Sequence, residues 1–250
     1  QEIQAAPTRD VNTVASTTAG VYQKDEGGDL NIRGARSDAT VYYVDGIKVR
    51  GNASVPQKGT EQITVITGGV PAQYGDVSGG VISITTRGPS STWSGGVEGV
   101  TSQFLDAFGY NLGSFDLSGP LLSKKDSTGK STGQSKAGFF LAGEYQYDKD
   151  PSPPAIPIYK VKDNILEYAR ENPLIPSPNG QGYIHRSSYY TLDSFDTQKY
   201  RENVAAKTIR LSGKIDIRPV KDVTLTLGGT FYRNDRHDFI DIYSLMNADQ

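Results

Sequence analysis

Residues 65–88 read VITGGVPAQYGDVSGGVISITTRG and combine six glycines with two short runs of β-forming residues. Glycine at this density is compatible with a phosphate-binding loop, a flexible linker, or a backbone that turns sharply and packs closely. The glycines do not follow the GxGxxG spacing of a dinucleotide-binding loop, and β-forming runs flank them on both sides. The pattern offers no helix N-terminus to an anion and therefore favours tight turns between strands.

The composition excludes several classes of function. The chain has 250 residues, a formal net charge of −2 and no cysteine, which excludes a polybasic nucleic-acid surface, a disulfide framework and a thiolate metal site. Its hydrophobic content of 36% includes no apolar run long enough for a transmembrane helix. The two histidines, His185 and His237, lack metal-ligand spacing, and STGKST lacks a P-loop glycine because Lys124 occupies that position. We expect no enzymatic activity, no metal site and no cofactor.

The first part of the chain, to about Gly88-Pro89, predicts a compact mixed α/β unit. Asp45-Gly46 lies between two β-forming runs and is typical of a two-residue type I′ hairpin turn. Residues 7–23 predict one short helix that is capped by Thr8 or Asp10 and stopped by Gly20.

The second part alternates between apolar and polar residues. In KTIRLSGKIDIR, residues 207–218, the odd positions are apolar or small and the even positions are polar, which is typical of a strand with one polar face. The same pattern predicts about five strands in all. A soluble β-sandwich is the alternative to a barrel, although charges and hydroxyls along the polar faces favour a wet lumen. Aromatic residues near one strand end suggest an interfacial girdle, namely Tyr145, Tyr147, Phe231 and Tyr232.

The connections between these strands differ greatly in length. Residues 123–136 are a polar connection and residues 219–222 a tight turn, whereas residues 151–206 form a long segment rich in Pro, Tyr, Asn and Ser. Residues 164–173 within it predict a short helix that ends at Pro173. Alternating strands with short turns at one end and a long loop at the other are typical of an outer-membrane β-barrel.

NIRGARSDATVYYVDGIKV, followed by EQITVITGGVPAQYGDVSGGVISITTRG, resembles the plug domain of TonB-dependent outer-membrane receptors. The shared features run in the family's order from about Pro7 to Gly88. The next stretch, WSGGVEG to DAFGYNLGSFDLSGPL, resembles the first two barrel strands of this family, particularly its Oar-like branch from Bacteroidetes. The resemblance implies a plug domain at residues 1–88, incomplete at its N-terminus and without a visible Ton box. Antiparallel strands of a transmembrane β-barrel are expected at residues 89–250, about five of the family's roughly 22.

The resemblance also implies a function and a location. The expected protein binds a ligand at the surface of a Gram-negative bacterium and imports it past a movable plug, using energy that TonB delivers from the inner membrane. The plug would face the periplasm, and residues 151–206 would be extracellular. The alternative is a receptor-like barrel that serves as a structural or docking subunit of an outer-membrane complex, with a surface lipoprotein as a possible partner. The ligand cannot be read from the sequence.

Individual residues receive expected roles from the same resemblance. Charges between the plug and the inner barrel wall are expected at Arg33, Arg36, Glu61 and Arg87, although Arg36 and Arg87 are equally compatible with solvation in a wet lumen. Tyr42 and Tyr43 are expected to pack the hairpin. The plug motif comprises Gly34, Asp45, Gly46, Gly68, Gly69, Pro71, Tyr74, Gly75, Gly79 and Gly80.

Two further groups lie in or beside the long connection. Tyr183, Tyr189 and Tyr190 are candidates to bind a ligand or partner, or to stabilise the loop itself. Asp148 and Asp150 lie at a predicted strand end beside Pro151, where carboxylates are ordinarily solvated. The alternative is that they form a Ca²⁺ site.

Overall fold

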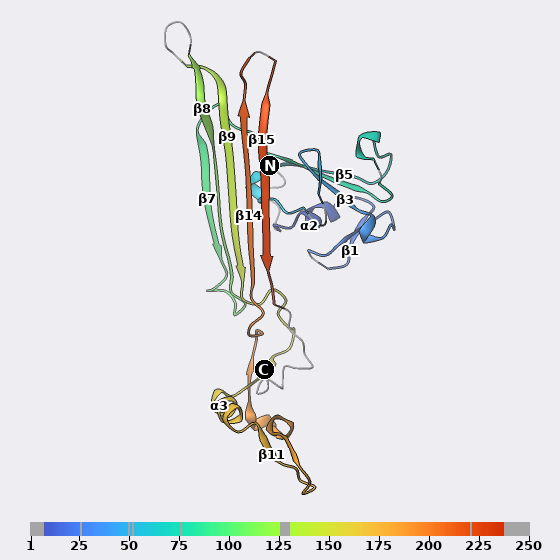
Figure 1. The fold of residues 1–250 in the computed structure, drawn as a ribbon, viewed down its shortest axis with the longest axis vertical. Helices are drawn as coiled ribbons and strands as arrows, with labels where there is room; N and C mark the ends of the chain where they lie inside the picture. The colour runs from blue at the N-terminus through green and yellow to red at the C-terminus, as the bar shows by residue number, and fades with distance from the viewer. Residues whose placement is uncertain are drawn as a thin grey trace. The chain divides into compact units, whose positions relative to one another are not determined.

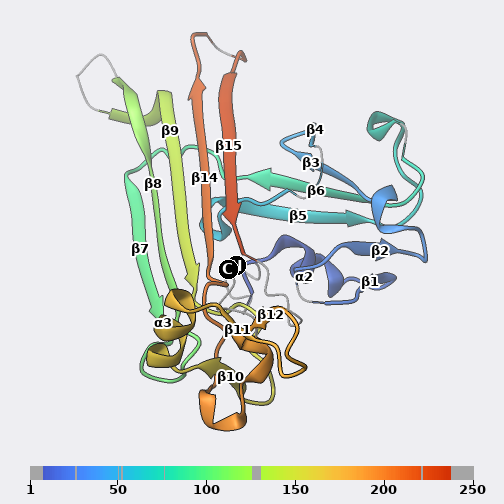
Figure 2. The ribbon, with the colours of Figure 1, turned by 60° about the horizontal axis from the view of Figure 1, so that its bottom comes forward.

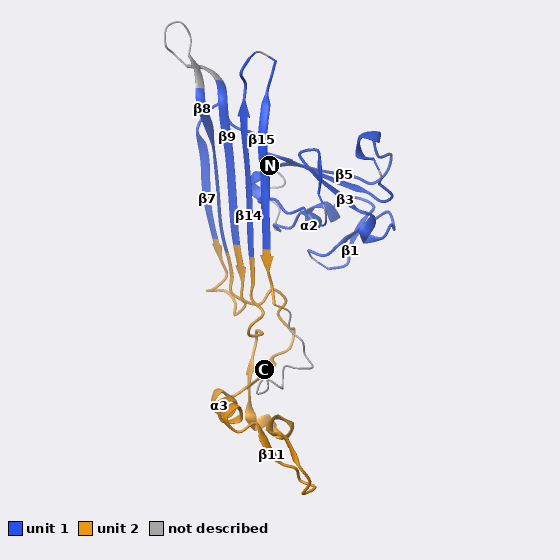
Figure 3. Ribbon diagram, viewed as in Figure 1, with its two compact units in different colours: residues 1–99, 112–145, 208–233 blue, residues 100–111, 146–207, 234–250 orange. Residues whose placement is uncertain are grey.

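The computed structural model describes residues 8–25, 27–49, 51, 53–75, 77–125, 131–220 and 222–237. The chain divides into two compact units (Figure 3). The first unit comprises residues 1–99, 112–145 and 208–233, and the second comprises residues 100–111, 146–207 and 234–250. The predicted boundary near Gly88-Pro89 stays a prediction.

A four-stranded sheet in the first unit, here called the N-terminal sheet, has the strand order β4-β3-β6-β5 (Figure 2). Its strands β3 and β6 are parallel, whereas β3 pairs with β4 and β5 pairs with β6 in antiparallel fashion. Side chains from this sheet, α2 and β2 form the apolar core, including Leu30, Ile32, Ile82 and Ile84. The strands are β3 (Val41–Val44), β4 (Ile47–Val49), β5 (Thr60–Ile66) and β6 (Val81–Thr86).

The predicted hairpin joins β3 to β4. Asp45 and Gly46 have φ angles of 48° and 81°, as a type I′ turn requires at both central positions. The predicted packing roles of Tyr42 and Tyr43 agree with their burial. The Tyr42 hydroxyl donates a hydrogen bond of 2.8 Å to Asn12 Oδ1, and burial raises the pKa of this phenol to about 12.

The N-terminal helix is shorter than predicted. Helix α2 spans Val11–Ser16, and Asp10 caps it by accepting a hydrogen bond of 2.8 Å from the Thr13 N–H. The residues after Gly20 form β1 (Val21–Gln23), which pairs antiparallel with β2 (Leu30–Ile32). The predicted cap at Asp10 agrees with the structure, but the helix ends at Ser16, before the predicted stop at Gly20, and residues 17–20 form a turn in which Gly20 has φ of 84°.

The glycine-rich segment within residues 65–88 joins the antiparallel strands β5 and β6, as the β-forming runs on either side of it predict. A single-turn helix, η3 (Ala72–Tyr74), lies between them. Gly69 has φ of 64°, a conformation that favours glycine. A Cβ on Gly79 would lie 2.7 Å from the Ala39 carbonyl oxygen, so this glycine permits close backbone packing. Gly75, which follows η3, has φ of −27° and lies outside the left-handed region.

The longer strands form a five-stranded sheet in the order β15-β14-β9-β8-β7, here called the long-strand sheet. The arrows in Figure 1 alternate in direction from each strand to the next. Strands β8 and β9 extend into residues 123–125 and 131–136, so the predicted polar connection at 123–136 is mostly strand. The strands are β7 (Ser94–Thr101), β8 (Tyr110–Lys125), β9 (Ser131–Asp148), β14 (Ala206–Ile217) and β15 (Leu225–Asp235).

Burial on the long-strand sheet is the reverse of that in a soluble sandwich. The polar positions of β14, among them Thr208, Arg210 and Ser212, are buried, whereas the alternate apolar positions Leu211 and Ile215 are exposed. Strands β8 and β9 follow the same rule, with Ser114, Ser118 and Glu144 buried and Phe115, Leu117 and Leu141 exposed. A sandwich would bury the apolar face in its core. The sheet therefore presents its polar face inward and its apolar face outward.

In the second unit, the long connection between β9 and β14 is folded. Strands β10 (Ile158–Val161) and β13 (Phe195–Gln198) pair antiparallel, as do β11 (Leu174–Pro176) and β12 (Tyr183–His185). Helix α3 (Asp163–Glu171) lies between β10 and β11, and Pro173 follows it as predicted. Short helical turns occur at Arg186–Tyr189 and Leu192–Ser194. The remaining turns, Ser37–Ala39 (η1) and Gln57–Gly59 (η2), belong to the first unit.

Within the described residues, no helix is long and apolar enough to cross a membrane.

The close packing at Gly79 makes a testable prediction. Replacing Gly79 by Ala places a methyl group against the backbone of Ala39, which cannot move aside as a side chain would, so we expect destabilisation of about 1–3 kcal/mol. Gly88→Ala is the matched control, because its Cβ would meet nothing within 4 Å. Hydrogen exchange of the β3 and β6 amides measures the difference, and equal protection in the two variants would contradict the packing argument.

Candidate functional site: ion pairs between the N-terminal part and the long strands

Four charged side chains meet on the inward face of the long-strand sheet. Arg9, which precedes α2, lies 2.7 Å from Glu98 of β7 and 3.7 Å from Glu144 of β9. Arg210 of β14 lies 2.6 Å from the other oxygen of Glu144. The Glu144 side chain has no exposed surface. Two arginines thus neutralise two glutamates, and we call these four residues the charge cluster.

Two hydroxyl groups hydrogen-bond to members of the charge cluster, whereas Arg9 Nη1 and Glu144 Oε2 are buried and meet only as an ion pair. Arg210 Nε donates a bond of 2.8 Å to Ser54 Oγ, and Ser114 donates one of 3.1 Å to Glu98. Buried charges are tolerated when each is paired and hydrogen-bonded, whereas loss of one partner is strongly destabilising. Because Arg9 and Ser54 belong to the N-terminal part and the other members to the long strands, the cluster holds these two parts of the first unit together.

A second contact lies where the turn η2 meets the long strands. Lys58 Nζ is 3.5 Å from Asp116 of β8. A Cβ on the adjacent Gly59 would lie 3.3 Å from Ala142 Cβ and 3.4 Å from Ser212 Cβ, so η2 packs directly on β9 and β14. Beside this contact is a polar pocket of about 420 Å³, lined by Gln57, Lys58, Arg87, Gly95, Gly96, Glu98 and Asp116.

The hairpin residue Asp45 makes a third contact. Its carboxylate accepts hydrogen bonds from the Thr86 N–H (2.9 Å) and hydroxyl (2.5 Å), and it lies 3.2 Å from Lys214 Nζ of β14. Lys214 also donates to the Thr86 carbonyl at 3.1 Å. Burial alone would raise the pKa of Asp45, but the hydrogen bonds from Thr86 and Lys214 outweigh it and hold the pKa below its usual value. Asp45 therefore both forms the turn and joins the end of β6 to β14.

The four residues predicted to latch the plug take no part in these ion pairs. Arg33, Arg36 and Glu61 are exposed, and Arg87 is half-buried in the pocket beside Glu98 and Asp116. Among the described residues, no ion pair within 4 Å includes any of the four. Their role as a latch stays a prediction, and the contacts that the structure contains come from other residues.

The predicted plug-motif residues lie in the turns of the N-terminal sheet. Pro71 precedes η3, and Tyr74 at its end packs edge-on against Tyr43 with ring centroids 4.9 Å apart. Gly34 has φ of 78°, and a Cβ on Gly80 would overlap the Ile32 side chain. Gly68 lies against the Arg33 guanidinium group. These residues shape the backbone rather than form a chemical site.

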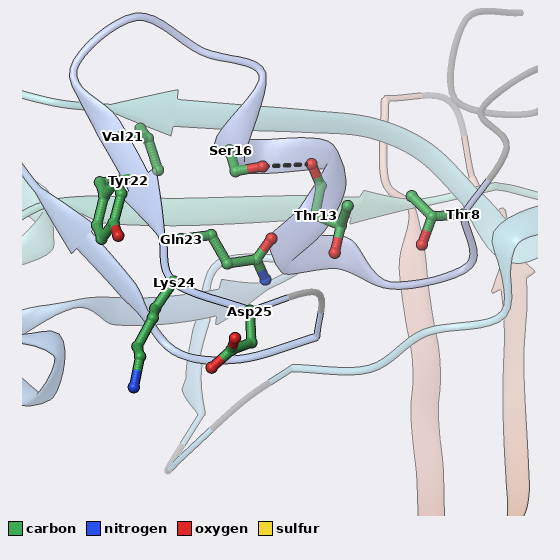
Figure 4. Close-up of a pocket in the computed structure, with 8 residues that line it drawn as sticks. All are labelled: Thr8, Thr13, Ser16, Val21, Tyr22, Gln23, Lys24 and Asp25. Atoms are coloured by element: carbon green, nitrogen blue, oxygen red, sulfur yellow. Dashed lines mark hydrogen bonds between the residues drawn. The ribbon is translucent and has the colours of Figure 1, made fainter. Parts of the chain in front are cut away.

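An open cavity of about 670 Å³ lies beside α2 and β1 (Figure 4). Its polar groups already serve the local fold, since the Ser16 hydroxyl donates to the Thr13 carbonyl at 2.8 Å and Gln23 Nε2 donates to the Gly28 carbonyl at 3.0 Å. The described residues also contain no cluster of three or more potential metal ligands. The residues that line the cavity are Thr8, Thr13, Ser16, Val21, Tyr22, Gln23, Lys24 and Asp25.

The three loop tyrosines of the second unit differ from one another. Tyr190 packs edge-on against Phe195 with ring centroids 6.0 Å apart, which is a stabilising role. Tyr183 and Tyr189 are exposed. Asp150 is buried and accepts hydrogen bonds from the backbone N–H groups of Ser152 and Arg201, so its oxygen atoms support the loop. Binding of a ligand or partner by the tyrosines stays a prediction.

The members of the charge cluster were not singled out by the sequence. The available signal was the alternation itself, which places Glu144, Arg210 and Lys214 at polar positions of their strands. It does not indicate which of many polar residues meets which cation, because Arg9 and Glu144 are separated by 135 positions (144 − 9).

Comparison with known proteins agrees with this architecture. Residues 1–81 match the family described as TonB-dependent Receptor Plug Domain. No curated protein matches the chain. The first 81 residues therefore resemble a plug domain of this type.

Several solved receptors share the fold. The siderophore receptor PirA from Pseudomonas aeruginosa has 20% identity and a TM-score of 0.56 over 94% of this chain and 34% of its own. A variant of the ferric enterobactin receptor PfeA from Pseudomonas aeruginosa has 19% identity and a TM-score of 0.55, covering 92% of this chain and 31% of its own. PirA from Acinetobacter baumannii has 21% identity and a TM-score of 0.57, covering 91% and 30%.

This chain therefore spans about a third of the length of the structures that it matches. The matched proteins are receptors, in agreement with the prediction that the chain is not an enzyme. The Bacteroidetes-type branch stays a prediction, because these matches come from Pseudomonas and Acinetobacter.

The charge cluster makes the next prediction. Replacing Glu144 by Ala leaves Arg210 buried beside Ser54 without its carboxylate, so we expect a loss of about 3–5 kcal/mol in the free energy of unfolding. Glu61→Ala removes an exposed carboxylate and should change the free energy by less than about 0.5 kcal/mol. Denaturant unfolding of the full-length protein in detergent measures both, and similar values for the two variants would contradict the assigned role.

The lowered pKa of Asp45 makes a pH-dependent prediction. The ionised carboxylate stabilises the folded state above the unfolded-state pKa of about 3.9, and this contribution disappears as the pH falls through the lower folded-state pKa. Asp45→Asn should therefore be less stable than the parent protein at neutral pH, and the difference should shrink in acid. The check is the difference in urea midpoint between the two proteins from pH 7 to pH 3. A difference that does not change with pH would rule out the charged contact.

Proposed function

We propose that this chain is part of a TonB-dependent outer-membrane receptor, which binds a ligand at the cell surface and imports it past a movable plug. The observation that carries the proposal is that a plug domain contacts the polar, inward face of long strands within one compact unit. The contact consists of paired charges and hydroxyl groups. An interface of paired charges and hydroxyl groups can hold a plug in place. It can also let the plug move when water enters and replaces the lost partners.

The physical reason is the modest net stability of such pairs. Separating two charges from each other costs little when water or other polar groups replace the lost partner. An apolar interface of the same area would lose about 25 cal/mol for each Å² exposed. Arg9 lies immediately before the N-cap of α2, so force applied from its N-terminal side would reach the Arg9 ion pairs early. TonB would supply that force through a Ton box outside the described residues.

The outward face of the long strands supports a membrane location. Its exposed apolar side chains would meet lipid in the outer membrane, while the polar face would line the lumen. Sheet edges in lipid must be paired, so the five strands would belong to a closed barrel of about 22 strands, as the family resemblance implies. In this arrangement the plug faces the periplasm, and the loop at residues 151–206 is extracellular. Arg33, Arg36 and Glu61 would meet barrel strands other than the five in this chain.

We expect the extracellular loops and the plug surface to determine which ligand binds. Siderophores and ferric enterobactin are named for the matched receptors, so iron–siderophore complexes are the first ligand class to test. Tyr183 and Tyr189 are the candidates for contact, because both are exposed on the folded loop.

A second function is docking within an outer-membrane complex, for example with a surface lipoprotein. The observation in its favour is that the second unit has its own fold and exposes large apolar side chains, including Tyr183, Tyr189 and Leu192.

A deletion in the full-length protein distinguishes the two functions. Removing the residues before Thr8, together with any segment that precedes them, should abolish energised uptake, while leaving ligand binding and membrane insertion intact. The measurement is uptake of labelled iron–siderophore complexes by cells, with surface binding as the control. Unchanged uptake, combined with dissociation of a partner complex on replacing Tyr183 and Tyr189, would favour docking over import.

A further inference from the structure

Arg87 occupies an unusual position among the charged residues of the first unit. It follows β6 directly, and its backbone N–H donates a hydrogen bond of 2.8 Å to the Gly59 carbonyl. Its main chain is thus fixed where η2 packs on the long strands. Its half-buried side chain lines the 420 Å³ pocket together with Lys58, Glu98 and Asp116.

The charges of this pocket and of the charge cluster, which share Glu98, do not balance when they are counted together. Four cations (Arg9, Lys58, Arg87 and Arg210) face three carboxylates (Glu98, Asp116 and Glu144). Arg9, Lys58 and Arg210 each lie within 4 Å of a carboxylate. Within the described part of the chain, Arg87 makes no such ion pair. One cation is therefore in excess while Arg9 is in place.

Withdrawal of Arg9 removes this excess. Three cations and three carboxylates would remain, and Glu98 would be the carboxylate without a cation. Removing one partner of a buried pair is normally strongly destabilising. Glu98 keeps 34% of its side chain exposed and borders the same pocket as Arg87, so it remains accessible from that side.

We propose that Arg87 is the reserve partner of Glu98 and replaces Arg9 when the plug moves. The pocket supplies the space for the guanidinium group to turn toward Glu98. Lys58 is not the reserve partner, because it is already paired with Asp116. This pair lies against Gly96, where an added Cβ would be 3.2 Å from Asp116 Oδ1 and 3.4 Å from Lys58 Nζ. The exchange keeps every carboxylate neutralised, which lowers the free-energy cost of releasing Arg9. This inference rests on the proposed movement of the plug.

A double-mutant cycle in the full-length receptor tests the exchange. The variants are Arg9→Gln, Arg87→Gln and the double variant, and the measurement is hydrogen exchange of amides in β5 and β7 in detergent. Arg87→Gln should raise the exchange rate only slightly, because Arg9 still neutralises Glu98. Arg9→Gln should raise it more, because Glu144 also loses a cation, although Arg87 still neutralises Glu98. The double variant should raise it about tenfold more than the product of the single effects, which is a coupling typical of residues that share a partner.

Two controls make the result specific. In a Glu98→Gln background the coupling should disappear, since no carboxylate remains to be neutralised. Arg36→Gln in place of Arg87→Gln should combine with Arg9→Gln without coupling, because Arg36 is exposed and does not line the pocket.

Effects that multiply without coupling, or coupling that persists in Glu98→Gln, would overturn the proposal. So would equal exchange rates in Arg9→Gln and in the double variant, because Arg87 would then not substitute for Arg9. The cycle needs neither ligand nor TonB. Absence of coupling would therefore leave the import function standing, and unchanged uptake in the deletion experiment would contradict import without altering the result of the cycle.

Discussion

The neutralisation of Glu144 is the constraint on which the contact between the plug and the long strands depends. This carboxylate has no exposed side-chain surface, so it needs cations in fixed positions. Arg210 comes from a neighbouring strand and Arg9 from the plug, which makes the plug part of the environment that the strand requires. Two serines add hydrogen bonds to these charges: Ser114 of the sheet donates to Glu98, and Ser54 of the N-terminal part accepts from Arg210.

Much of the fold follows from local patterns in the sequence. The turn at Asp45-Gly46 is predictable because two adjacent residues determine its backbone conformation. The faces of the long strands are predictable because side chains alternate along every strand. The C-terminal end of α2 is less predictable, because the helix stops at Ser16 in a turn held by hydrogen bonds such as Thr18 N–H to the Ala15 carbonyl, ahead of the glycine that signals a stop. Residues 123–136 look like a loop by composition, yet most of them continue strands that their neighbours stabilise.

The candidate site was less accessible to sequence reasoning. Alternation places Arg210 and Glu144 on polar faces, but the pairing of Arg210 with Ser54 joins residues 156 positions apart. Such contacts depend on the register of one sheet against another, and no local pattern encodes that register. Asp45 was predicted from its turn geometry alone, whereas its contact with Lys214 depends on where β14 lies.

The short segment between β6 and β7 has a mechanical consequence. β6 ends at Thr86 and β7 begins at Ser94, so seven residues connect the plug to the strand sheet. Seven fully extended residues span at most about 25 Å. The C-terminal end of the N-terminal part is therefore on a short covalent tether, so the plug movement that we propose would have to swing about that end or unravel from the other.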